Sequence, residues 1–137
     1  MPDAYAQPLV LLVDDYDDAR ELYGTYLAIH GYRVEEASDG HGAVEKALRL
    51  LPDIILMDLS LPGIDGWDVT SRLKRDDRTA HIPIIAFTAH ALPKEIARAL
   101  AVGCDAIITK PCLPEVLVKE IVRVLGARTG TGPRRGP

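Results

Sequence analysis

The chain has 137 residues, of which 47% are hydrophobic and 26% charged, and its formal net charge is −4 at pH 7. This length suffices for one domain with its own core, and the composition excludes a disordered, collagen-like or membrane protein. The negative charge does not favour binding to nucleic acid or to anionic lipid. We therefore expect a single cytoplasmic domain with no direct contact to nucleic acid or membrane.

The first half of the chain alternates strand patterns with helical patterns. Residues 1–8 form an N-terminal extension, and residues 9–13 are a continuous run of Leu and Val, typical of a strand buried on both faces. From Asp17 to Gly31 the apolar residues recur every three or four positions, which predicts a helix. The same alternation then predicts a strand over 32–37, a helix over 40–51 and a strand over 54–57.

The second half continues this alternation as far as residue 125. Pro and Gly residues within 62–66 mark a tight loop, after which a third helix is expected to run to Arg75. The remaining predicted elements are a strand over 82–87, a helix over 93–102 ended by Gly103, a strand over 106–109 and a helix over 114–125. Residues 126–137 contain four Gly and two Pro, and we expect them to be a disordered tail.

Five strands alternating with five helices predict a doubly wound α/β fold. Parallel neighbours need right-handed crossovers, so the pattern predicts a five-stranded parallel sheet with helices on both faces. The flavodoxin-like strand order 2-1-3-4-5 would make the first and third strands neighbours. Sites in such sheets lie outside the carboxyl ends of the strands, so the residues that close each strand are the functional candidates.

Chemically active residues close four of the five predicted strands. Asp14 and Asp15 follow the first strand, Asp58 the third, Thr88 the fourth and Lys110 the fifth. Crowded carboxylates are unfavourable unless a cation is present, and Mg²⁺ prefers oxygen ligands. A metal, an ammonium and a hydroxyl around a carboxylate nucleophile are what phosphoryl transfer requires. We therefore predict a Mg²⁺ site with Asp58 as the nucleophile.

Each of these residues alone has an ordinary explanation. The acidic pair could be a solvated loop or a helix cap, Thr88 could cap the next helix, and Lys110 could be a surface lysine. The second strand is followed by Ser38 and Asp39, which are typical of a helix cap. A functional role is favoured because the polar residues coincide at the ends of four different strands, where α/β domains place their chemistry.

Four segments around these residues carry a family resemblance: residues 13–15, 56–66, 88–89 and 109–111. With them, residues 9–125 resemble the receiver domains of bacterial two-component response regulators. The resemblance implies that Asp58 accepts a phosphoryl group from a histidine kinase or histidine phosphotransfer protein. Such a chain is a signalling protein rather than a turnover enzyme.

The resemblance also implies roles for the residues around the acceptor. Asp15 and Asp58 would bind Mg²⁺ together with the Ser60 carbonyl, and Asp14 would act through water. Thr88 and Lys110 would hold the phosphoryl oxygens, and the peptide bond from Lys110 to Pro111 would be cis.

Two positions depart from the family pattern. An aromatic residue usually stands three positions before the lysine and turns inward on activation, but Ile107 occupies that place. The residue after Pro111 is often Phe and is here Cys112, a smaller side chain. The first departure puts the aromatic switch in doubt, whereas neither affects the acceptor chemistry.

The sequence predicts output through a protein partner, as in single-domain regulators of the chemotaxis and cell-cycle kind. Leu113, Leu117, Ile121 and Val124 are expected to cover the sheet, while Val118 and Val122 extend the apolar arc of the last helix. We hypothesise that this flank and the fourth helix contact a downstream partner or a second copy. The alternative is that both valines pack under the fourth helix.

Three other interpretations compete with a phosphorylated receiver domain. A non-catalytic interaction module is disfavoured by the complete acidic set. A dehalogenase-like phosphatase would carry a second Asp two residues after its nucleophile, where this chain has Ser60. A fragment of a longer regulator or hybrid kinase is the third, and Met1 together with the tail favours a complete protein.

Overall fold

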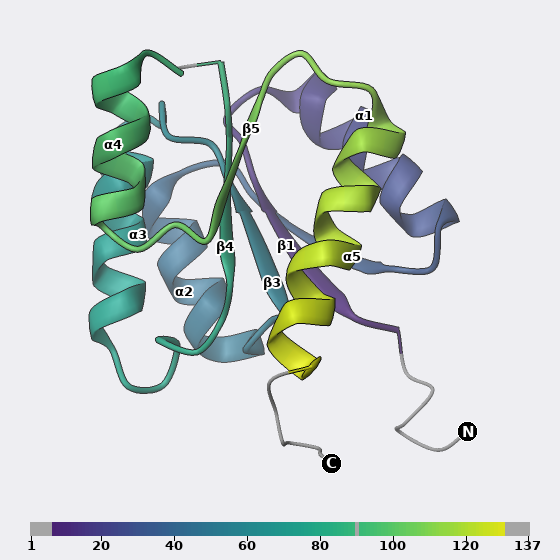
Figure 1. Ribbon diagram of the computed structural model, residues 1–137, viewed down its shortest axis with the longest axis horizontal. Helices are drawn as coiled ribbons and strands as arrows, with labels where there is room; N and C mark the ends of the chain where they lie inside the picture. The colour runs from purple at the N-terminus through teal and green to yellow at the C-terminus, as the bar shows by residue number, and fades with distance from the viewer. Residues whose placement is uncertain (1–6, 90, 131–137) are drawn as a thin grey trace.

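The computed structural model describes residues 7–89 and 91–130, which build a five-stranded parallel sheet with helices on both faces (Figure 1). The strand order is β2-β1-β3-β4-β5, so the predicted fold class and order are confirmed. The elements, in chain order, are β1 (Leu9–Val13), α1 (Asp17–Ile29), β2 (Arg33–Ala37), α2 (Gly40–Leu50), β3 (Ile54–Met57), α3 (Gly66–Arg75), β4 (Ile84–Thr88), α4 (Pro93–Ala101), β5 (Ala106–Thr109) and α5 (Pro114–Gly130). No helix in this described part is long and apolar enough to cross a membrane.

The core lies in two layers, one on each face of the sheet. Alternate residues of a strand face opposite sides, so Leu11 and Val13 pack in one layer while Val10 and Leu12 pack in the other. The first layer is covered by buried residues of α2, α3 and α4, and the second by those of α1 and α5. β1, β3 and β4 are buried along their whole length, which explains their continuous apolar sequences.

Helix α5 differs most from the sequence prediction. It continues to Gly130, so the expectation of disorder from residue 126 onward is wrong for residues 126–130, and residues 131–137 lie outside the described part. One glycine costs a helix only about 1 kcal/mol relative to alanine, which is too little for Gly126 to end an established helix. At the other end of the chain, residues 1–6 of the expected extension also lie outside the described part, and the Pro8 carbonyl accepts a hydrogen bond from the Arg33 amide at 2.9 Å.

Two further expectations need correction. Leu113 does not cover the sheet, because it lies in the loop before α5 and is 63% exposed. β4 begins at Ile84 instead of residue 82, since Pro83 has no amide hydrogen and the Ile84 amide donates to Oδ2 of Asp105 at 2.8 Å. Leu117, Ile121 and Val124 are buried as predicted.

The loop between β3 and α3 packs tightly on the end of β3. A Cβ atom at Gly66 would lie 2.3 Å from the Asp58 carbonyl oxygen and 2.6 Å from the Cα of Leu59. The Gly66 amide also donates to the Leu59 carbonyl at 3.0 Å. Only glycine therefore allows α3 to start directly against the strand end that carries Asp58.

Replacing Gly66 with alanine should destabilise the protein. We expect Gly66→Ala to lower the free energy of unfolding by about 1–3 kcal/mol, because the new methyl group overlaps backbone atoms that cannot move freely. Urea denaturation measures this change. Gly126→Ala is the matched control: a Cβ there meets open space within α5, and it should stabilise by about 0.5–1 kcal/mol. Equal unfolding midpoints for Gly66→Ala and wild type would contradict the packing argument.

Candidate functional site

The three predicted carboxylates lie together at the carboxyl edge of the sheet. β1 and β3 pair with Val13 opposite Met57, so the residues that follow them, Asp14 and Asp58, are neighbours. The Asp58 amide donates to the Val13 carbonyl at 3.0 Å, and carboxylate oxygens of Asp14, Asp15 and Asp58 lie within 4.8 Å of one another. Asp14 and Asp58 are buried, whereas Asp15 is exposed.

Lys110 reaches into this acidic cluster from the end of β5. Its Nζ atom binds Oδ2 of Asp14 and lies 3.6 Å from Oδ2 of Asp58. The same Nζ atom lies 5.1 Å from the ring centroid of Phe87, a second contact that favours a cation. The peptide bond from Lys110 to Pro111 is cis, as the resemblance implied.

The surroundings of the Asp58 carboxyl both favour and disfavour its ionised form. Burial raises its pKa above the ordinary value, and the carboxylates of Asp14 and Asp15 act in the same direction. The Ser60 amide, which donates to Oδ1 of Asp58 at 3.0 Å, and the Lys110 ammonium oppose this effect. The raised pKa means that burial and the two neighbouring carboxylates disfavour the ionised form of Asp58 more than the Ser60 amide and the Lys110 ammonium favour it.

Thr88 and Ser60 are placed beside the cluster through their backbones. Thr88 is fully buried at the end of β4, and its carbonyl accepts a hydrogen bond from the Lys110 amide at 2.9 Å. Ser60 is exposed and contacts Asp58 through its amide. The roles expected for the Thr88 hydroxyl and the Ser60 carbonyl stay predictions. Of the second-strand pair, Asp39 caps α2 as predicted, accepting a hydrogen bond from the Gly42 amide at 2.7 Å.

The residues at this edge fit a hard divalent cation. The three carboxylates outnumber the one ammonium, so the ionised cluster carries two uncompensated negative charges. Carboxylate oxygens are the ligands that Mg²⁺ prefers, and Mg²⁺ usually combines one or two of them with water. Because Asp15 is exposed, the cluster is also open to solvent on that side.

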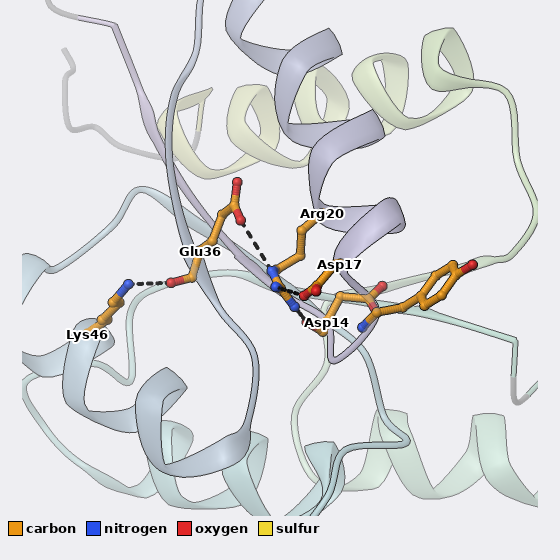
Figure 2. Close-up of polar contacts among 6 residues, drawn as sticks. Asp14, Asp17, Arg20, Glu36 and Lys46 are labelled. Carbon is orange, nitrogen blue, oxygen red and sulfur yellow. Dashed lines mark hydrogen bonds and ion pairs between the residues drawn. The ribbon is translucent and has the colours of Figure 1, made fainter.

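One residue next to the site, Arg20, was not predicted from the sequence. Arg20 extends from α1 and hydrogen-bonds the Asp14 carbonyl, the Asp17 carboxylate and the Glu36 carboxylate (Figure 2). Its spacing from Asp17 could have indicated a pair on one helix face, but such pairs are common. The contacts with β1 and β2 become visible only in the folded structure.

The matching protein family agrees with this geometry. Residues 10–122 match the response regulator receiver domain family. The chain belongs to that family. This receiver domain is 40% identical over 128 residues to the phosphate regulon transcriptional regulatory protein PhoB of Pseudomonas aeruginosa, covering 93% of this chain and 56% of PhoB. It therefore spans about half the length of that relative.

Shorter relatives match along nearly their whole length. The polar-differentiation response regulator DivK of Brucella anthropi is 36% identical over 117 residues, which cover 85% of this chain and 95% of DivK. The crystallised chemotaxis protein CheY4 of Vibrio cholerae superimposes with a TM-score of 0.83 at 32% identity, covering 87% of this chain and 99% of that one.

One solved relative contains the predicted metal. The receiver domain of a sensor histidine kinase from Pseudomonas aeruginosa PAO1 superimposes with a TM-score of 0.82 at 34% identity, covering 88% of this chain and 99% of that one. That structure has a magnesium ion coordinated in its active site cleft. Receiver domains are the phosphoacceptors of two-component signalling and interact with histidine kinases, and the Asp14, Asp15 and Asp58 cluster is the acidic site of this one.

Neutralising Asp58 should stabilise the metal-free protein. In Asp58→Asn a neutral amide of the same shape replaces a buried charge that faces two other carboxylates, so the thermal midpoint without Mg²⁺ should rise by a few degrees. Calorimetry in chelator-treated buffer measures this rise. The exposed Asp77 gives the control variant Asp77→Asn, which should leave the midpoint unchanged. A midpoint for Asp58→Asn at or below that of wild type would contradict the crowding argument.

Proposed function

We propose that Asp58 is the residue of this receiver domain that accepts the phosphoryl group, with Mg²⁺ bound by Asp15, Asp58 and the Ser60 carbonyl, and by Asp14 through water. The single observation that supports this assignment is the position of Asp58, which lies close both to the acidic pair that follows β1 and to the Lys110 ammonium that follows β5. Asp14 already binds Lys110 directly, which leaves Asp58 as the buried carboxylate with the weaker cationic contact. The donor is a histidine kinase or a histidine phosphotransfer protein, in the cytoplasm.

In the proposed transfer, an Oδ atom of Asp58 forms a bond to the phosphorus of a phosphohistidine. The bond between phosphorus and the imidazole nitrogen breaks, and that nitrogen keeps the electron pair and takes up a proton. The product is an aspartyl phosphate on Asp58. Bound Mg²⁺ supplies positive charge next to the oxygens of the transferred group.

Lys110 and Thr88 are the proposed contacts of the phosphoryl oxygens. Lys110 lies within 4 Å of Asp58 before the reaction, so its Nζ atom can turn from a carboxylate oxygen to a phosphoryl oxygen with little movement. Thr88 ends the neighbouring strand β4, where its hydroxyl can donate to the same group. The aspartyl phosphate carries roughly −1.5 to −2 charge where the carboxylate carried −1, and the contacts that its phosphoryl oxygens recruit bias the loop between β4 and α4.

We propose that this shift is transmitted through the face formed by α4 and α5, which flank β5 (Figure 1). Four apolar side chains on or next to these helices are more than half exposed: Leu92, Leu100, Leu113 and Val122. Val118 packs against the core layer of α1 and α5 and not under α4, and Val122 is exposed, so the alternative that both valines pack under α4 is wrong. Ile107 is half-buried against the core layer of α2, α3 and α4, and we propose no aromatic switch at that position.

Phosphorylation should depend on both Asp58 and the metal. Acetyl phosphate with Mg²⁺ should add one phosphoryl group to wild type and to Asp77→Ala, but none to Asp58→Ala, as measured by intact-protein mass spectrometry. Removing Mg²⁺ with a chelator should abolish labelling of wild type, because the crowded carboxylates then repel the anionic donor. Equal labelling of wild type and Asp58→Ala would refute the acceptor assignment.

The exposed flank of α5 should mediate contact with a second copy of the phosphorylated domain. Light scattering after phosphorylation should give a dimer for wild type and a monomer for Val122→Glu, which places a charge in the contact. Leu22→Glu is the matched control, since Leu22 is 56% exposed on α1 and Val122 is 57% exposed on α5. A dimer that survives Val122→Glu, or a wild-type monomer, would rule out self-association through this flank.

A further inference from the structure

Arg20 connects three segments of the chain beside the acidic cluster (Figure 2). Its Nη1 atom donates to the Asp14 carbonyl oxygen at 2.6 Å, and its Nε atom donates to Oε1 of Glu36 at 3.2 Å. Its Nη2 atom binds the Asp17 carboxylate in the first turn of α1. The Arg20 side chain is only 15% exposed. The guanidinium is therefore held from β1, β2 and α1 at once.

The group that this guanidinium fixes is the peptide between Asp14 and Asp15. The Asp14 carboxylate has its own anchors, because Oδ1 accepts from the Tyr16 amide at 2.9 Å and Oδ2 binds Lys110. The Asp15 side chain is exposed and forms no hydrogen bond or ion pair within residues 7–89 and 91–130. The Asp15 backbone is therefore held on one side by the Tyr16 amide and on the other by the peptide plane that Arg20 fixes, and its side chain follows that backbone.

We propose that Arg20 is a positioning residue for the Mg²⁺ site, acting through the carbonyl of Asp14 to orient the carboxylate of Asp15. This inference rests on the proposed function, since it assumes that Asp15 is a ligand. Groups that hydrogen-bond to metal-binding residues orient them, and removing such groups commonly weakens metal affinity 10- to 100-fold. Such groups usually hydrogen-bond to the side chain of the metal ligand, whereas Arg20 hydrogen-bonds to the backbone carbonyl of the residue before it.

If Arg20 acted only through its positive charge, replacing it would change the Mg²⁺ affinity in the opposite direction. Arg20 is a cation that contacts the Asp14 backbone beside the acidic cluster, so its charge repels an incoming Mg²⁺ and removing that charge should tighten binding. Loss of positioning should instead weaken binding. The sign of the change in Mg²⁺ affinity therefore separates the two roles.

Lys46 provides a matched control for the charge. Its Nζ atom binds the carbonyl of Glu36, the same β2 residue whose side chain binds Arg20 (Figure 2). Lys46 forms no hydrogen bond or ion pair with Asp14 or Asp15 in the described structure. Lys46→Met thus removes a positive charge from the same neighbourhood and leaves the Arg20 contacts in place.

The experiment is a Mg²⁺ titration of the full chain by isothermal titration calorimetry. Arg20→Met, which loses both charge and guanidinium, and Arg20→Lys, which keeps the charge, should both bind Mg²⁺ about 10-fold more weakly than wild type. Lysine fails in this position because its single ammonium cannot reproduce the planar donor fork. Lys46→Met should bind Mg²⁺ at least as tightly as wild type.

Two results would overturn the inference. One is wild-type or tighter Mg²⁺ affinity in Arg20→Lys and Arg20→Met, and the other is an equal loss in Lys46→Met. The wild-type titration alone tests the underlying metal site, because absence of binding there defeats the proposed function whatever the variants do. Nuclear magnetic resonance supplies a second readout: the metal-free Asp15 amide should shift in both Arg20 variants and stay in place in Lys46→Met.

Discussion

The contact between the Lys110 ammonium and the carboxylates of Asp14 and Asp58 is the interaction on which the site depends. Three carboxylates with oxygens within 4.8 Å of one another repel strongly, and two of them are buried where water screens little. The Lys110 ammonium reduces the repulsion among the carboxylates, but the cluster keeps a net negative charge. The same imbalance that costs stability makes the cluster attractive to a divalent cation, which is typical of the acidic site of a receiver domain.

This arrangement follows from strand order more than from any single residue. The order β2-β1-β3-β4-β5 places β1 beside β3 and β4 beside β5, so Asp14 meets Asp58 while Thr88 meets Lys110. These residues come from segments separated by up to 96 positions in sequence. The sheet core supports them rigidly, because β1, β3 and β4 are buried along their whole length. The site residues lie in loops, and the buried strands beneath them fix the positions of those loops.

Most of the fold and the central cluster could be predicted from the sequence, because both depend on local patterns. Continuous apolar runs mark β1 and β3, and an acidic residue at each run's end marks the site. The end of α5 could not be predicted in this way, since the low helix propensity of Gly126 is overridden once the helix is established. The contacts of Arg20 could not be predicted either. Its partner Glu36 lies sixteen residues further along the chain, and its other partner is the backbone carbonyl of Asp14, a group that every residue carries.

The proposed chemistry requires that Asp14, Asp15 and Asp58 share one divalent cation. Crystals soaked in Mn²⁺, which has the same preference for oxygen ligands, would locate that cation by anomalous diffraction. We expect one dominant anomalous peak within coordination distance of the Asp15 and Asp58 carboxylates. A dominant peak elsewhere on the protein, or none at this edge of the sheet, would contradict that expectation.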